Sequence, residues 1–177
     1  QAVKNGGQIA VDEINAAGGI NGAMIEYKFE DDVSDGETSV NAYNNLYDWG
    51  MQVLAGPVTT GPSISVSAKV NEDRVFMLTP SASSPDVTSG KDNVFQMCFT
   101  DPNQGTGSAT YITANMPESK IAIIYQNDDA YSQGIRDNFV SQSSANGLEV
   151  VYEGTFTKDT MTDFSVQLTG AQAAGAD

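Results

Sequence analysis

The sequence predicts an α/β fold built on parallel sheets, and two observations indicate it. Apolar residues change from helical spacing to strand spacing and back along the whole chain, so expected helices and strands alternate. The strand-like segments at 75–78 and 121–124 are entirely apolar. That composition is typical of parallel strands covered by helices on both faces.

The first two elements differ clearly in their spacing. Residues 2–17 place apolar side chains on one helical face, and the glycine pair 18–19 closes this helix. A strand is expected at 24–32, where Ile25, Tyr27 and Phe29 alternate with charged residues.

A second helix is expected from Ser34, which forms an S-x-x-E capping box with Glu37, to the residue before Gly50. Its apolar stripe consists of Val40, Tyr43 and Tyr47. The same rhythm then predicts strands at 52–56, 74–79, 94–99, 120–126 and 148–156, and helices at 63–72, 104–116, 132–146 and from 162 onward. The segment 99–105 is either a boundary between two domains or an ordinary connecting loop.

Charge and composition exclude several classes of function. The chain of 177 residues has a formal net charge of -15, which opposes binding to nucleic acid or to an anionic membrane surface. No apolar run approaches the roughly 20 residues of a membrane span. Cys98 is the single cysteine, so no intrachain disulfide can form, and it is expected to be buried. The absence of histidine removes Ser-His and Cys-His nucleophilic pairs and the commonest transition-metal ligand.

Three motifs are too incomplete for the chemistry that they suggest. The loop from Gly56 to Gly61 has the spacing of a phosphate loop, but Pro62 replaces its lysine. Residues 31–36 match the first half of a calcium-binding EF-hand, which lacks its final glutamate. Asp128 and Asp129 are neighbours in a loop, where helix capping is the simpler interpretation. No metal site, cofactor or catalytic residue is therefore predicted.

Small hydroxyl residues follow two neighbouring predicted strands. They are Thr59, Thr60 and Ser63 in the first loop, and Ser81, Ser83 and Ser84 in the second. In an open parallel sheet, ligands bind beyond the carboxyl ends of the strands, where helix N-termini favour anions. These hydroxyls could cradle a carboxylate, or they could only cap helices and fill turns.

Five segments in succession resemble the leucine/isoleucine/valine-type periplasmic binding proteins of ABC importers: VDEINAAGGINGAMIEYKFEDD, VLAGPVTTGPSISVSA, RVFMLTPSASSPDVT, FTDPNQG and IAIIYQNDDAYSQGIRDNF. The resemblance covers essentially the whole chain. It implies a type I periplasmic-binding-protein fold with two doubly wound parallel-sheet lobes. Residues 1–100 would be lobe 1 without its first strand, and 101–177 the first part of lobe 2, so the chain is expected to be truncated at both ends of a longer protein.

By this resemblance Thr60, Ser81 and Ser83 correspond to the lobe 1 positions that hold the α-carboxylate and α-ammonium of an amino acid. Ser81 would act through its backbone, and Tyr131 corresponds to an aromatic residue that covers the ligand when the lobes close. Cysteines that pair in some members would lie near Ser34 and Thr59, and this chain has none there.

The implied function is extracytoplasmic capture of an amino acid, branched-chain or similar, in the periplasm or on a cell-surface lipoprotein. The partner would be the membrane permease of an ABC importer, and the protein would not be an enzyme. The alternative is a ligand-sensing receptor or regulatory domain on the same fold. A small α/β enzyme is disfavoured by the missing histidine.

Overall fold

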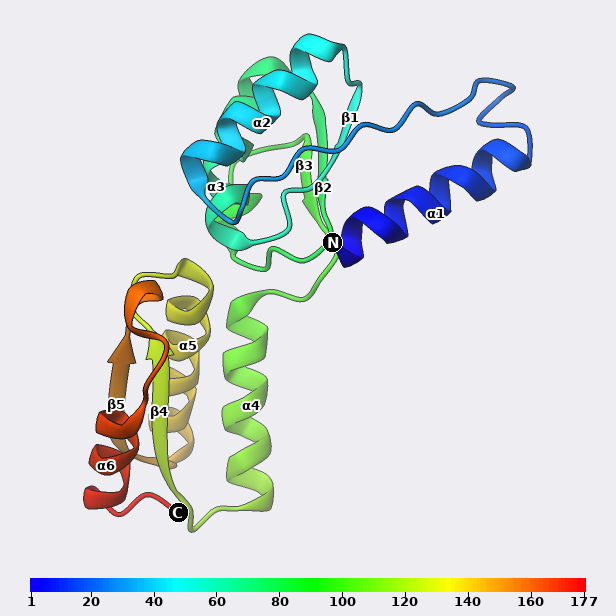
Figure 1. Ribbon diagram of the computed structural model, residues 1–177. Coiled ribbons are helices and arrows are strands. Elements are labelled where there is room, and N and C mark those ends of the chain that lie inside the picture. The colour runs from blue at the N-terminus through cyan, green and yellow to red at the C-terminus, as the bar shows by residue number, and fades with distance from the viewer. The chain divides into compact units, whose positions relative to one another are not determined.

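The structure is a computed structural model that describes residues 1–177, and from residue 36 onward helices alternate with strands along the chain (Figure 1). The α-helices are α1 (Ala2–Ala16), α2 (Gly36–Trp49), α3 (Thr60–Asp73), α4 (Asp101–Asn115), α5 (Ala130–Asn146) and α6 (Ser165–Ala173). The strands are β1 (Val53–Ala55), β2 (Phe76–Thr79), β3 (Val94–Gln96), β4 (Lys120–Gln126) and β5 (Glu149–Phe156). Two short 3-10 helices are η1 (Pro85–Val87) and η2 (Lys158–Thr160). The predicted α/β class with parallel sheets is confirmed.

The chain forms two compact units. Unit 1 consists of residues 1–81 and 91–96, and unit 2 consists of residues 82–90 and 97–177. The chain passes between the units after residues 81, 90 and 96. No helix in either unit is both long enough and apolar enough to cross a membrane.

Unit 1 contains a parallel three-stranded sheet in the order β1-β2-β3. Leu54, Met77 and Val94 lie side by side in register, and all are buried on one face. On the opposite face Phe76 and Phe95 stack with their ring centroids 5.3 Å apart, and both remain exposed. The expectation that helices cover both faces is therefore wrong for this sheet in this chain.

Helices α2 and α3 pack against each other in unit 1 (Figure 1). Val66 and Val70 of α3 are fully buried. Tyr43 of α2 is 2% exposed, and its hydroxyl donates to a carboxylate oxygen of Asp73 at 2.9 Å. Lys69 pairs with the other oxygen of Asp73 at 2.7 Å, so one carboxylate joins the two helices.

The predicted strand at 24–32 is wrong, because these residues form no strand. The side chain of Asn15 instead accepts from the backbone N–H of Ile25 at 2.8 Å and donates to its carbonyl at 2.9 Å. Alternating side chains define two faces, but a strand exists only where a neighbouring strand supplies hydrogen bonds. In this structure the only strand that pairs with β1 is β2.

The predicted capping box of the second helix is also wrong. Asp35 is the N-cap of α2, and its carboxylate accepts from the backbone N–H of Thr38 at 2.8 Å. Ser34 has a positive φ of 55°, which is incompatible with the extended backbone of an N-cap residue. The predicted end of the helix is confirmed at Gly50, which adopts the left-handed conformation.

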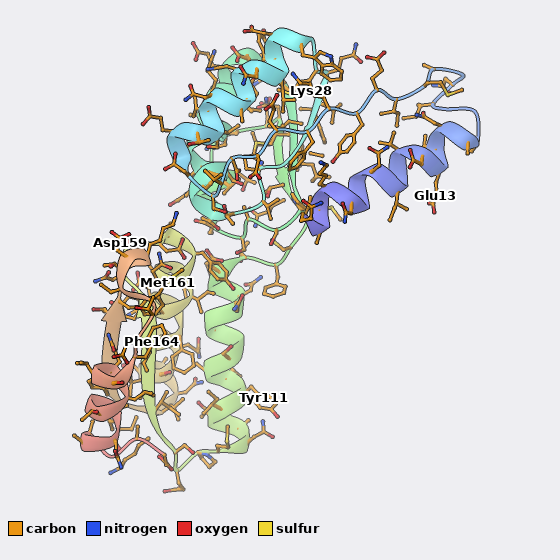
Figure 2. The ribbon with its side chains drawn as sticks, in the orientation of Figure 1. Glu13, Lys28, Tyr111, Asp159, Met161 and Phe164 are labelled. Atoms are coloured by element: carbon orange, nitrogen blue, oxygen red, sulfur yellow. The ribbon has the colours of Figure 1, made fainter.

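Unit 2 pairs β4 and β5 in parallel and packs α4 against α5. Its core contains Ala109, Phe139 and Leu148, with Ile112, Ile121, Ile123 and Val150 packed against them. The ring of Phe164 meets Phe156 edge to face at 5.0 Å, whereas Tyr111 points outward from α4 (Figure 2).

The predicted strand at 94–99 ends early, because β3 stops at Gln96. Cys98 is only partly buried, and its thiol donates to the carbonyl of Ala82 at 3.3 Å. The expectation that Cys98 is a buried apolar residue is therefore wrong. Cys98 lies in the loop after β3, so its burial is not set by the alternation of side chains along a strand.

Candidate ligand-binding site

The loop after β1 is tied to the end of β2 through one carbonyl group. The carbonyl of Pro57 accepts from the hydroxyl of Thr79 at 2.7 Å and from that of Ser63 at 3.1 Å. The hydroxyl of Ser63 therefore stabilises the loop after β1 through this hydrogen bond. Thr60, the first residue of α3, is 3% exposed.

The N-terminus of α3 lacks a side-chain cap. Thr59 has the extended backbone of an N-cap residue, but its side chain makes no capping hydrogen bond. The first N–H groups of a helix have no partner within the helix, and its dipole is positive at this end. The start of α3 can therefore attract an anionic group.

Ser81 follows β2 and is exposed, and its backbone N–H lies 3.5 Å from the hydroxyl of Thr79. Strands β1 and β2 are parallel neighbours, so their carboxyl ends lie at the same edge of the sheet. The structure thus brings Thr60 and Ser81 to one edge of unit 1, as expected for two loops that follow adjacent strands.

Ser83 and Ser84 belong to unit 2, whereas the expectation placed Ser83 in the same lobe as Thr60 and Ser81, and the two serines differ in environment. The hydroxyl of Ser84 accepts from the backbone N–H of Asp86 at 3.3 Å and caps η1, so capping is the correct interpretation for Ser84. Ser83 is 4% exposed, and its carbonyl accepts from the backbone N–H of Asp101 at 3.0 Å.

Tyr131 lies at the start of α5 in unit 2. Its side chain is 40% exposed, and its hydroxyl accepts from the amide of Gln104 at 3.4 Å. Tyr131 also lines a hollow of about 460 Å³ between α4, β4 and α5. The preceding Asp129 caps α5 by accepting from the N–H of Ser132 at 2.9 Å, as the capping interpretation expected.

Asp128, the other carboxylate of this loop, accepts from the backbone N–H of Lys158 at 3.2 Å. Hydrogen bonds from Gln126, and then from that N–H group, lower the pKa of Asp128. Asp128 therefore ties β4 to the turn after β5 and does not cap α5. No group of three potential metal ligands is present in the structure.

Asp101 is the residue near this site that the sequence analysis missed. It is fully buried, and neither carboxyl oxygen has a hydrogen-bond partner of normal length and angle. Burial raises its pKa most, the side chain of Ser83 lowers it, and the charge of Asp129 raises it. An aspartate before a proline at a helix start indicates capping, and this pattern gives no sign of burial.

The four residues expected to contact a ligand are thus divided between the units. Thr60 and Ser81 lie in unit 1 at one edge of its sheet, and Ser83 and Tyr131 lie in unit 2. Within unit 2, Ser83 contacts Asp101 and Tyr131 contacts Gln104, so both approach the first turn of α4.

Comparison with known proteins identifies relatives of the whole chain. Residues 1–177 match the family described as periplasmic binding protein. The Leu/Ile/Val-binding protein homolog 3 of Brucella melitensis is 38% identical over 177 residues, which are 99% of this chain and 47% of that protein. The chain therefore spans about half the length of the curated relatives that it matches.

Solved structures show the same relationship. The branched-chain amino acid transporter substrate binding protein LivJ from Streptococcus pneumoniae, in complex with isoleucine, has a TM-score of 0.87 and 32% identity. The match covers 99% of this chain and 49% of LivJ. The leucine binding protein LivK from Thermotoga maritima has a TM-score of 0.89 and 26% identity, and the match covers 98% of this chain and 49% of LivK. This chain therefore belongs to the periplasmic binding protein family.

Proposed function

We propose that this chain forms part of an extracytoplasmic solute-binding protein that captures an amino acid, branched-chain or similar, for an ABC importer. Relatives named for leucine, isoleucine and valine binding, and a structural neighbour that holds isoleucine, support this ligand class. The protein acts by binding and releasing its ligand to a membrane permease, without chemical turnover. We further propose that residues 1–100 belong to one lobe of this protein and 101–177 to the other, although residues 82–90 and 97–100 pack with unit 2 in this structure.

The observation that carries the proposal is the uncapped start of α3 beside the hydroxyl-rich end of β2. The α-carboxylate of an amino acid fits the N–H groups at this helix start, with Thr60 as a hydroxyl donor. Ser81 contributes its backbone, Ser83 binds the α-ammonium or α-carboxylate, and Tyr131 covers the ligand.

Calorimetric titration with L-leucine and L-isoleucine tests these roles in the natural gene product that contains these residues. A hydrogen bond to a charged group contributes about 1.5–3 kcal/mol. Thr60→Ala and Ser83→Ala should therefore each weaken binding roughly tenfold to a hundredfold. The melting temperature of the ligand-free protein should change little in both variants.

Thr110→Ala is the matched control, because Thr110 is exposed on α4 and its hydroxyl donates only to the helix carbonyl of Thr106. This control should bind as tightly as the wild type. Unchanged affinity in both Thr60→Ala and Ser83→Ala would overturn the assignment of these hydroxyls.

A further inference from the structure

The carboxyl group of Asp101 lies at the start of α4 but does not cap this helix. As the first residue of α4 it could accept helix N–H groups, yet both of its oxygens are buried and neither accepts from the helix. The contact with α5 is close: a Cβ atom added to Gly134 would lie 3.0 Å from one carboxyl oxygen of Asp101. The carboxyl group of Asp101 is therefore shielded from water at its contact with α5.

The charged groups around Asp101 are acidic. Asp129, the N-cap of α5, is the charged group whose field reaches Asp101. Asp86 and Asp137 line a neighbouring hollow of about 310 Å³ together with Gly134. The one cation on α5, Arg136, is paired with Asp137 and Glu153. No cation therefore compensates the buried carboxyl of Asp101, and a neutral donor must do so.

Ser83 is that donor. The backbone N–H of Asp101 donates to the carbonyl of Ser83 at 3.0 Å, which holds the two residues together. Burial raises the pKa of the Asp101 carboxyl, and a hydrogen bond from the side chain of Ser83 acts in the opposite direction and lowers it. A serine hydroxyl has one hydrogen and two acceptor lone pairs. Once its hydrogen points to Asp101, the oxygen of Ser83 can only accept from any other group.

We propose that Asp101 is a positioning residue that sets the direction of the Ser83 hydroxyl, so that Ser83 accepts a hydrogen bond from the α-ammonium of an amino-acid ligand. The ligand part of this inference rests on the proposed function of Ser83. The ionised carboxyl of Asp101 takes the hydroxyl hydrogen. A protonated Asp101 can instead donate to Ser83, which turns that hydrogen toward the ligand and opposes an ammonium group.

The first test needs no ligand. Carbon-detected NMR titration gives the pKa of the Asp101 carboxyl in the ligand-free protein. Removing the donor in Ser83→Ala should raise this pKa, because the ionised form loses its favourable contact. Ser84→Ala, in which the neighbouring hydroxyl caps η1, should leave it unchanged. An equal pKa in the wild type and Ser83→Ala overturns the coupling.

The second test is a double-mutant cycle with L-leucine as the probe. Asp101→Asn should weaken binding about tenfold, consistent with a charge-assisted hydrogen bond that loses its orientation. In a Ser83→Ala background the same change should have no further effect. Asp159→Asn, an exposed aspartate in η2 (Figure 2), is the control and should bind normally. Additive losses in the cycle overturn the positioning role.

The probe 4-methylpentanoate separates this role from general damage, since it keeps the carboxylate and side chain of leucine but lacks the ammonium. Asp101→Asn should leave its affinity unchanged, whereas structural damage would weaken both ligands equally. If the wild type does not bind L-leucine while Ser83→Ala raises the pKa of Asp101, the proposed function fails and the coupling of these two residues stands.

Discussion

At the scale of single residues, hydrogen bonds of buried polar side chains connect elements of this protein. Tyr43 is an example, because its hydroxyl reaches Asp73 across the interface between α2 and α3. Burial, followed by the hydrogen bond to Asp73, raises the pKa of Tyr43 above its ordinary range. The hydrogen bond from Lys69 lowers the pKa of Asp73, so the acceptor stays ionised at neutral pH.

Tyr43→Phe keeps the buried ring and removes only the hydroxyl. We expect a loss of about 1.5 kcal/mol in the free energy of unfolding, because the hydrogen bond to an ionised acceptor disappears. Urea unfolding measures the change. The control is Tyr47→Phe, since Tyr47 stacks on Tyr43 but is 45% exposed, and its change should stay within about 0.5 kcal/mol. Equal effects of the two variants would show that the contact with Asp73 contributes nothing.

At the scale of elements, two glycines of α4 differ in how closely they approach a neighbouring helix. Gly105 faces α5, where an added Cβ atom would lie 2.4 Å from the carbonyl oxygen of Ile135 and 2.8 Å from the backbone nitrogen of Phe139. Gly107, two residues further on, has open space around the same position. Of these two glycines, only Gly105 is therefore required for the close packing of α4 on α5.

Gly105→Ala and Gly107→Ala should change stability in opposite directions. An alanine at 105 must push α4 away from the backbone of α5, which should cost about 1–3 kcal/mol. An alanine at 107 should stabilise the protein by about 0.5–1 kcal/mol, because alanine has the higher helix propensity. Thermal unfolding of both variants is the measurement. A stabilising Gly105→Ala would contradict the packing of these two helices.

At the scale of the whole molecule, the chain forms two units joined at three places, after residues 81, 90 and 96. In the proposed function, ligand contacts come from both units, with Thr60 and Ser81 in the first and Ser83 and Tyr131 in the second. We propose that binding favours a closed state of the two lobes, as the resemblance to periplasmic binding proteins implies.

Tyr131→Ala should reduce closure as well as affinity, since Tyr131 is proposed to cover the bound ligand. Small-angle X-ray scattering with and without saturating L-leucine, together with calorimetry, measures both quantities in the natural gene product. Tyr111→Ala is the control, because Tyr111 is 65% exposed on α4 (Figure 2). Full compaction and wild-type affinity in Tyr131→Ala would remove this residue from the site.

The sequence by itself determined the alternation of helices and strands after residue 36, the parallel α/β class and the position of the hydroxyl residues behind two neighbouring strands. These properties follow from apolar spacing and from glycine and proline, whose effects act within a few residues. The end of α2 at Gly50 is one such local property, because glycine adopts the left-handed conformation at little cost.

Only the tertiary structure decided which residues join a sheet and which polar groups are buried. The segment 24–32 has the alternation of a strand, but its hydrogen bonds depend on a neighbour distant in the sequence, and Asn15 supplies some of them instead. Asp101 looks like an ordinary helix-start residue until α5 and Ser83 enclose it. Burial and hydrogen-bond partners are properties of residues that meet in space, so no local pattern could specify them.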